Sequence, residues 1–156
     1  MPTILVDIPK DAFPGSARAA LVRGFNPPAG AAEQIPADPR QRSLCWVLVN
    51  EVATGGWICG GVDLTSQLLP CSARIYLPSG VLDETSRASY VQCVHASFEQ
   101  ALPADDRRRL VTSVLLQEGA DGRWGVGGAV WTLADFARAA GFAHLQHLVD
   151  HGQEPR

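Results

Sequence analysis

A glycine-rich stretch with one tryptophan, GRWGVGG, covers residues 122–128. Loops of this composition bind phosphates in two common patterns. The dinucleotide pattern would continue from Gly125 and Gly127 to a glycine at position 130, where Val130 stands instead. A P-loop needs Lys followed by Ser or Thr, whereas Ala129 and Val130 follow here. The stretch is therefore not predicted to bind a nucleotide.

Cysteines and histidines are the other side chains that could hold a metal or react. Four cysteines are spread along the chain without a close pair or a metal-ligand spacing: Cys45, Cys59, Cys71 and Cys93. We expect them to be reduced thiols. Three histidines near the C-terminus, at 144, 147 and 151, could share one helical face, but their polar surroundings indicate an exposed helix end. The sequence thus implies no metal and no cofactor.

The bulk composition fits one domain over residues 1–156, with 46% hydrophobic and 19% charged residues. A net charge of -3 gives no reason to expect binding to nucleic acid or to an anionic membrane. The start of the chain lacks the pattern of a signal peptide, and no segment has 18 uninterrupted apolar residues. We therefore expect a cytoplasmic protein.

The chain contains an internal repeat. Residues 35–61 align without a gap with residues 102–128, at an offset of 67, and 13 of the 27 positions are identical. The second segment ends in GRWGVGG and the first in GGWICGG, so Trp57 and Trp124 are equivalent. Such self-similarity indicates a duplicated unit. The units are residues 2–67 and 68–130, followed by a tail at 131–156.

Each unit has the pattern of strand, helix, strand and glycine-rich turn. The first unit has strands at 3–8 and 44–52, with a helix at 15–25 that Ser16 could cap. Pro27-Pro28 is expected to break or kink this helix. In the tail, Thr132 is expected to cap a helix that Gly141 stops.

The second unit has strands at 73–77 and 110–118, and between them a helix at 83–102 capped by Asp83. Five positions at helical spacing are expected on its inner face: Ala88, Val91, Val94, His95 and Phe98. A helix that crosses between strands makes them parallel. The predicted class is α/β (α+β): two tandem β-α-β units that form a four-stranded mixed sheet, with both helices on one face and a C-terminal helical tail.

Alternation along the strands predicts which sheet face meets the helices. The helix-facing set is Ile4, Val6, Ile8, Ala73, Ile75 and Leu77. The opposite set is Leu5, Asp7, Arg74 and Tyr76. The opposite face mixes apolar and charged side chains, which favours its being covered by other subunits.

A β-α-β unit that begins Met-Pro and ends in a strand, Glu, Gly-x-aromatic and Gly-Gly resembles the tautomerase superfamily, with 4-oxalocrotonate tautomerase as the nearest motif match. Duplicated members include cis-3-chloroacrylic acid dehalogenase, malonate semialdehyde decarboxylase and macrophage migration inhibitory factor. The segment TSVLLQEGADGRWGVGGAVW carries the resemblance most clearly, and WVLVNEVATGGWICGG is a weaker copy. The resemblance covers residues 2 to about 130.

The resemblance implies a catalytic amino-terminal proline, which here is Pro2 after removal of Met1. An α-amino group has a reference pKa of about 7.7–8.0, and burial lowers it, so that a free base is available at neutral pH. Such a base can move a proton from a carbon next to a carbonyl, which is tautomerisation. The position matching Pro2 in the second unit is Cys71, which has no free amine, so one site per chain is expected. If Met1 is retained, Pro2 is an amide and the mechanism cannot operate.

The same resemblance suggests the substrate-binding residues and also shows a departure. Trp57 and Trp124 match the family's active-site aromatic position, although packing at a subunit interface is an equal alternative. The arginines that hold substrate carboxylates in the family are missing, because Ala12, Trp46 and Ser113 occupy their positions. Lys10, Arg74 and Arg123 are the candidate replacement cations, although a surface or structural charge is the alternative for each. Asn50 and Gln117 are secondary candidates for polar contacts.

Two hypotheses follow. The first is a tautomerase-type isomerase that acts on a small enol, ketoacid or unsaturated acid, with keto-enol tautomerisation favoured over dehalogenation or decarboxylation. The second is a weakly active or inactive binding protein on the same scaffold, which the missing arginines favour. In both, three chains are expected to form a homotrimer, because exposed sheet edges and the outer sheet face need cover.

Overall fold

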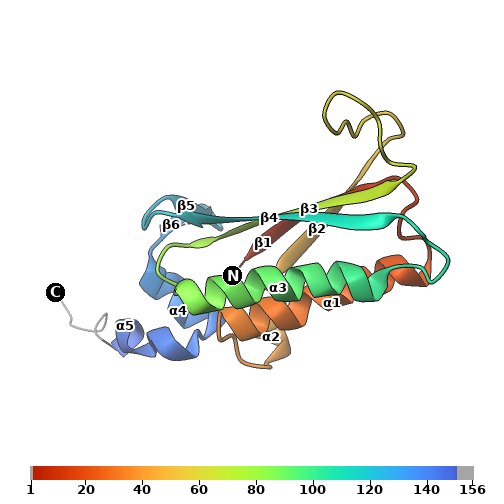
Figure 1. The fold of residues 1–156 in the computed structure, drawn as a ribbon. Helices are drawn as coiled ribbons and strands as arrows, with labels where there is room; N and C mark the ends of the chain where they lie inside the picture. The colour runs from red at the N-terminus through yellow and green to blue at the C-terminus, as the bar shows by residue number, and fades with distance from the viewer. Residues whose placement is uncertain (1, 151–156) are drawn as a thin grey trace.

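A four-stranded sheet forms one layer of the molecule, and two long helices cover one of its faces (Figure 1). The structure is a computed structural model that describes residues 2–150. The sheet has the strand order β2-β1-β3-β4. Its strands are β1 (Thr3–Pro9), β2 (Trp46–Val52), β3 (Leu68–Pro78) and β4 (Arg109–Gly119), and the covering helices are α1 (Ser16–Ala32) and α3 (Glu84–Ala101).

The two halves of the sheet are related as the internal repeat predicts. β1 pairs with β2 in parallel, and β3 pairs with β4 in parallel. The central pair, β1 and β3, is antiparallel, with Thr3 opposite Tyr76 and Val6 opposite Ala73. Each half is therefore a β-α-β unit, and the two halves join through the antiparallel pairing of β1 with β3. This arrangement confirms the predicted fold class, including the placement of both helices on one face.

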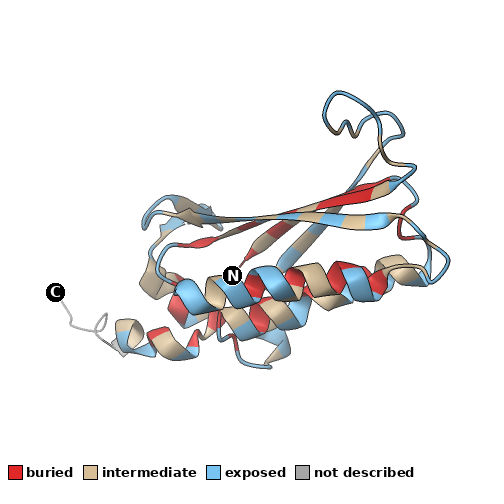
Figure 2. Cartoon of the chain, in the orientation of Figure 1, coloured by how far each residue is buried: buried red, intermediate tan, exposed pale blue. Residues whose placement is uncertain are grey.

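The helix-facing side of the sheet is the core. Ile4, Val6, Ile8, Ala73, Ile75 and Leu77 are all fully buried, as the alternation predicted. The opposite face is open in the single chain (Figure 2). It exposes large apolar side chains on both outer strands, with Trp46 57% exposed, Leu48 51% and Leu115 53%. A face of this kind is typical of an interface.

Helix α1 corrects the expectation of a break at Pro27-Pro28, one of the two outcomes predicted there, because a single helix continues through the prolines to Ala32. A proline at position 28 removes the N–H group that would bond to the carbonyl of Gly24 four residues earlier. In this fold that carbonyl lies 2.9 Å from the hydroxyl of Ser97 on α3, which can donate its single hydrogen to it or to the carbonyl of Cys93, also at 2.9 Å. Gly24 allows this close approach, since a Cβ there would lie 3.2 Å from the Cβ of Ser97. The second helix thus supplies the missing donor.

The helix starts and the inner face of α3 differ in part from the sequence-based expectation. Ser16 is the first residue of α1 and makes no capping hydrogen bond, because Gly15 holds the cap position. Asp83 does cap α3, through a 2.7 Å bond from the backbone N–H of Ser86. The buried face of α3 consists of Tyr90, Val94, Ser97, Phe98 and Ala101.

Two positions expected on the inner face of α3, Ala88 and Val91, are exposed. Tyr90 takes an inner position in their place and is fully buried, while Val94 and Phe98 are buried as predicted. His95 is half-buried, and its Nδ1 lies 2.8 Å from the hydroxyl of Thr112.

The remaining elements are short and lie around one end of the sheet (Figure 1). They are α2 (Pro39–Arg42), the hairpin of β5 (Trp124–Val126) and β6 (Ala129–Trp131), α4 (Leu133–Ala140), η1 (Ala143–Leu145) and α5 (Gln146–Asp150). Thr132 caps α4, and Gly141 ends it in the left-handed conformation, as predicted. Phe136, Phe142 and Leu145 are buried in the main core. The tail is thus an integral part of the fold.

Candidate functional site

Pro2 lies buried at the amino-terminal end of β1, on the helix-facing side of the sheet. Its carbonyl accepts a 3.1 Å hydrogen bond from the backbone N–H of Trp46, the first residue of the neighbouring strand β2. Alternation along β1 places Pro2 on the same face as Ile4 and Val6. The amino-terminal end of the chain thus enters the core. Whether Met1 is removed concerns a residue outside the described range.

A buried carboxyl group lies at the C-terminal end of α1. Glu33 follows the last residue of α1 and is 0% exposed. Leu21, Phe25, Ala29 and Glu33 are spaced four residues apart, so Glu33 continues the apolar face of the helix. Burial raises the pKa of Glu33 to about 7, and the Tyr90 hydroxyl opposes a further rise. Glu33 therefore exchanges protons near neutral pH.

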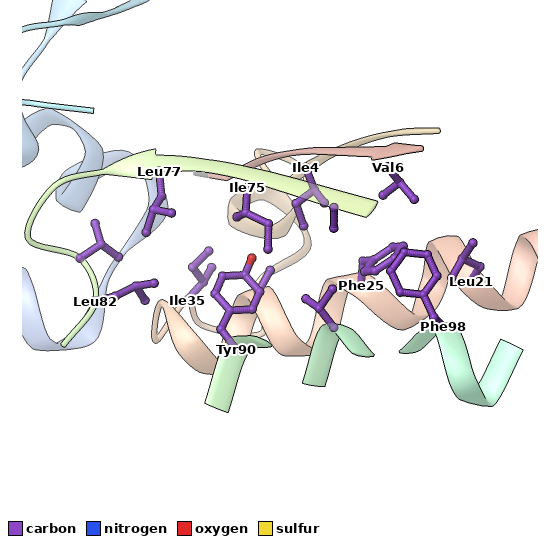
Figure 3. Packing of buried hydrophobic residues seen from close by; sticks show 14 of the residues in the cluster. Ile4, Val6, Leu21, Phe25, Ile35, Ile75, Leu77, Leu82, Tyr90 and Phe98 are labelled. Carbon is purple, nitrogen blue, oxygen red and sulfur yellow. The ribbon is translucent and has the colours of Figure 1, made fainter. Parts of the chain in front are cut away.

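Tyr90, which is buried, and Cys45, which is half-buried, are two titratable side chains whose pKa values respond to Glu33. Tyr90 is fully buried and points from α3 toward the sheet between Ile35 and Ile75 (Figure 3). Burial and the negative charge of Glu33 hold the pKa of its hydroxyl well above the usual range. Burial and the same carboxyl group raise the pKa of the Cys45 thiol to about 11. Cys45 directly precedes Trp46, whose backbone N–H bonds to the carbonyl of Pro2.

A pocket of about 460 Å³ lies at the same end of the sheet. It is lined by Thr3, Leu5, Tyr76, Gln117, Gly119, Arg123, Trp124 and Gly125. Thr3 follows Pro2 directly, so the pocket is adjacent in the chain to the candidate catalytic proline. Within residues 2–150, the guanidinium of Arg123 makes no ion pair. The pocket thus offers an aromatic wall and one cation.

The equivalent pocket of the first unit lies toward the other end of β1. Trp57 lines it together with Asp7, Ser72 and Ile58. Two other residues predicted to bind substrate contact the carboxyl group of Asp7. Asn50 donates a 2.9 Å hydrogen bond to it, and Arg74 forms an ion pair with it at 3.1 Å. These contacts hold the pKa of Asp7 below its usual value although its burial opposes this effect.

Lys10 lies near this second region, in a small pocket with Trp57 and Arg108. Cys71 occupies the place equivalent to Pro2, but in the middle of a continuous strand. Burial raises the pKa of its thiol to about 12. The structure therefore brings Arg123, Trp124 and Gln117 together in one pocket, whose lining does not include Pro2. It places Trp57, Asn50, Arg74 and Lys10 around Asp7 and the small pocket beside it.

The C-terminal tail contacts both the hairpin that carries Trp124 and the chain that follows α1. The ring of Phe136 on α4 packs edge-on against Trp124, with ring centroids 5.5 Å apart. Farther along, the backbone N–H of Ala143 donates a 3.1 Å hydrogen bond to the carbonyl of Gln34, next to Glu33. The tail thus supports the aromatic wall and closes the end of the core that holds the carboxyl group.

The predicted histidine group has no metal-site geometry in the described chain. The Nε2 atom of His144 lies 2.8 Å from the carbonyl of Val81, while His147 is exposed. His151 lies outside the described residues. Within residues 2–150, no three His, Cys, Asp or Glu side chains are arranged to hold a metal ion. No helix in this range is long and apolar enough to cross a membrane.

Sequence analysis missed Glu33, although one signal was available. The spacing of Leu21, Phe25 and Ala29 leads to Glu33 if α1 continues past Pro27-Pro28. The expected break at the prolines concealed that continuation.

Comparison with solved structures shows the fold of the chain. A fused 4-OT symmetric trimer matches with a TM-score of 0.66 at 17% identity, over 89% of this chain and 98% of the other. The macrophage migration inhibitory factor of Toxoplasma gondii matches with a TM-score of 0.59 at 15% identity, over 83% and 99%. A structure of Pt0534 inactivated by 2-oxo-3-pentynoate gives 0.66 at 10% identity, over 83% and 95%. No protein-family model and no curated protein sequence matches the chain.

These matches confirm the resemblance at the level of the fold. The chain has the duplicated β-α-β fold of the fused 4-OT and macrophage migration inhibitory factor structures, and the matches cover 82–89% of this chain and 94–99% of the others. The identities of 10–18% carry no residue-level assignment.

Proposed function

We propose that this chain is a tautomerase-type enzyme in which the amine of Pro2 transfers a proton on a small enol or ketoacid. The observation that carries the proposal is the burial of Pro2 at the start of the central strand β1, next in the chain to Thr3, which lines a pocket with an aromatic wall on the outer face of the sheet. Removal of Met1 would leave Pro2 with a secondary amine in an interior of low polarity. Such an amine titrates near neutral pH and can act as a base.

The proposed reaction needs one proton to move and return. The amine takes a proton from the carbon next to a carbonyl, so that a C–H bond breaks, an N–H bond forms and the electron pair becomes an enolate. The ammonium then gives the proton to another atom of the same molecule. The pyrrolidine ring restricts the direction of the nitrogen. No cofactor is needed for this sequence.

Arg123 and Trp124 supply the substrate contacts in this proposal. A guanidinium without an ion pair among the described residues can bind a substrate carboxylate, and the indole can pack against an unsaturated chain or a ring. One cation fits a monocarboxylate better than a diacid. The inactivation of the similarly folded Pt0534 by 2-oxo-3-pentynoate, an unsaturated ketoacid, agrees with this substrate class.

Assembly into a homotrimer is part of the proposal. The outer sheet face exposes Trp46, Leu48 and Leu115, which an isolated chain leaves in water. Fused 4-OT structures of the same fold are trimers. The four cysteines are free thiols, which agrees with the cytoplasmic location predicted from the sequence.

The test compares native protein, Pro2→Ala and a chain with one uncleaved residue added before Pro2. Ketonisation of phenylpyruvate enol and of 2-hydroxymuconate is followed across pH, with Pro14→Ala at an exposed proline as the matched control. We expect Pro2→Ala to lose activity by about 100-fold or more. The extended chain should be inactive, because its proline nitrogen is an amide. Equal rates for all four proteins would refute the proposal and favour a binding protein.

A further inference from the structure

We propose that the pocket beside Trp57 is a second ligand-binding site, which takes a small uncharged molecule with neighbouring hydroxyl groups, such as a pyranose sugar. This pocket, which we call the Asp7 pocket, is lined by Asp7, Val52, Gly56, Trp57, Ile58 and Ser72. Its volume of about 320 Å³ falls in the range of small-molecule sites, about 300–1,000 Å³. Binding there does not depend on the chemistry of Pro2.

The Asp7 pocket is the structural counterpart of the Arg123 pocket, which is the pocket described above that contains Arg123 and Trp124. Every residue that lines the Asp7 pocket has an equivalent in the other repeat unit, and each equivalent lines the Arg123 pocket. In the same order, the equivalents are Tyr76, Gly119, Arg123, Trp124, Gly125 and Thr3.

The strands place the two pockets at opposite ends of the central strand pair. Asp7 is opposite Ser72 at one end of the pairing between β1 and β3, and Tyr76 is opposite Thr3 at the other end. The loop between β2 and β3, which carries Trp57, projects from the end of the sheet opposite the β5–β6 hairpin (Figure 1).

The turns that follow the two tryptophans share one conformation. A backbone bridge between Cys59 and Val62 closes the first turn, and the pairing of β5 with β6 closes the second. The glycines at 60 and 61 have φ values of 60° and 87°, and those at 127 and 128 have 59° and 84°. The first unit thus keeps the shape of the pocket that the second unit forms.

The side chains give the Asp7 pocket a different chemistry. Gly56 stands where the other pocket has Arg123, so the cation is missing there. Asp7 stands where the other pocket has Tyr76, so a carboxylate is gained. Trp57 keeps the indole. A ketoacid that suits the Arg123 pocket would therefore be repelled from this one.

Three donors hold the carboxylate of Asp7 in place. Its Oδ1 accepts a 2.9 Å hydrogen bond from Asn50, and its Oδ2 accepts bonds of 3.1 Å from the hydroxyl of Ser72 and the guanidinium of Arg74. A carboxylate has about four acceptor positions, so Oδ1 can accept one more bond. Within residues 2–150, Arg74 uses one of its N–H groups in this way, and its side chain is 44% exposed.

This network selects an uncharged ligand. An organic cation would meet the guanidinium of Arg74 together with the carboxylate of Asp7, and would gain little from the pair. An anion would meet the carboxylate without a cation in the lining of the pocket. A hydroxyl group can donate to Oδ1 of Asp7, while the C–H groups on one face of a pyranose ring pack against the indole of Trp57.

Two further cations lie in an adjoining pocket that shares Val52 and Trp57 with this one. They are Lys10 and Arg108. Arg108 is paired with Asp106 at 2.6 Å, and neither cation lines the Asp7 pocket. They therefore do not turn the Asp7 pocket into an anion site.

The Asp7 pocket lies outside the apolar part of the outer sheet face. Asn50, Asp7, Ser72 and Ser113 form one polar row across the four strands. The exposed apolar side chains belong to other rows, since Leu48 is opposite Leu5 and Leu115 is opposite Arg74. The apolar rows favour assembly, whereas the polar row favours water or a hydrogen-bonding ligand.

The experiment measures binding by NMR on the full chain in its native assembly, with methyl β-glucopyranoside as the probe. The four tryptophans give separate indole N–H signals, which report the tryptophan that the probe reaches. Choline and lactate serve as a cationic and an anionic probe. Saturation transfer to the probe compares Trp57→Leu and Asp7→Asn with two matched controls. These are Trp124→Leu in the equivalent pocket and Asp105→Asn at an exposed carboxylate.

We expect the sugar to bind with a Kd in the millimolar range and to shift the indole signal of Trp57 alone. Trp57→Leu and Asp7→Asn should each weaken binding about tenfold, because the first removes the packing surface and the second the charged acceptor. Both controls should bind the sugar as the native chain does, and choline and lactate should bind at least about tenfold more weakly. Trp57 lies on a loop outside the sheet, so Trp57→Leu still gives a result if Asp7→Asn does not fold.

Three outcomes would overturn this inference: stronger binding of choline or lactate than of the sugar, equal binding by all the variants, or no shift of the Trp57 signal at about 100 mM sugar. Pro2→Ala should bind the sugar as the native chain does. A protein that binds the sugar but lacks tautomerase activity would therefore refute the proposed function and leave the second site supported.

Discussion

Phe136 packs edge-on against Trp124, and the distance between their ring centroids is 5.5 Å. The contact joins a helix of the C-terminal tail to the glycine-rich hairpin that carries the candidate aromatic wall. Trp131, on the other strand of that hairpin, packs on the same ring at 5.1 Å. The tail thus fixes the orientation of a candidate substrate-binding residue that lies outside it.

Replacing Phe136 with leucine tests this relationship. Leucine keeps much of the buried volume but removes the ring contacts, so we expect a stability loss of about 1–2 kcal/mol and a several-fold rise in KM for phenylpyruvate enol. Phe142→Leu is the matched control, because Phe142 is equally buried and stacks on neither tryptophan. Chemical unfolding and steady-state kinetics measure the two effects. The same KM change in both variants would contradict the account.

The charge of Arg123 can be tested separately. Arg123→Gln should raise KM for phenylpyruvate enol by about tenfold, since a charge-assisted hydrogen bond to a carboxylate contributes about 1.5–3 kcal/mol. The matched control is Arg23→Gln, at an exposed arginine of α1. An unchanged KM in Arg123→Gln would exclude Arg123 as the carboxylate contact.

The stability of the protein should fall as pH rises through neutrality. The pKa of Glu33 is raised from an ordinary 4.5 to about 7 in the folded chain, so its stabilising effect is complete below about pH 4.5 and is lost as pH rises through 7. The difference corresponds to about 3 kcal/mol. Urea unfolding measures the free energy of unfolding between pH 4.5 and 8. As pH rises, the free energy of unfolding of Glu33→Gln should increase relative to that of the native chain, while that of Glu99→Gln, at an exposed glutamate of α3, should change in parallel with the native value. Parallel curves for all three would show that Glu33 does not titrate in this range.

The hydroxyl of Ser97 should be coupled to Pro28. Ser97→Ala leaves the carbonyl of Gly24 without its described donor, and we expect a loss of about 1–3 kcal/mol. In a Pro28→Ala background the loss should be smaller, because the substitution restores a backbone N–H that can bond to the carbonyl of Gly24 along the helix. A double-mutant cycle by chemical unfolding measures this coupling. Purely additive effects would contradict the explanation for the continuous helix.

The sheet was predictable because its signals are local and repeated. The offset of 67 residues and the alternation of Ile4, Val6 and Ile8 identified both units and the buried face. The continuity of α1 was not predictable in this way, because the donor that compensates for Pro28 is Ser97, far along the chain.

The candidate site was predictable in part. The repeat and the resemblance led to Pro2, Trp124 and Arg123, which lie at one end of the sheet. Glu33 was missed because its burial depends on α1 passing the prolines and on the tail closing over Gln34. Long-range contacts of this kind leave only a weak trace in the sequence.

The central claim is that Pro2 carries a free, reactive amine. Incubation with 2-oxo-3-pentynoate followed by peptide mass spectrometry tests it most directly, because amines add to the conjugated alkyne of this compound. We predict that the amino-terminal peptide begins at Pro2 and carries the adduct, and that prior labelling abolishes tautomerase activity. An amino-terminal peptide that still begins with Met1, or an adduct found only on cysteines, would contradict the claim.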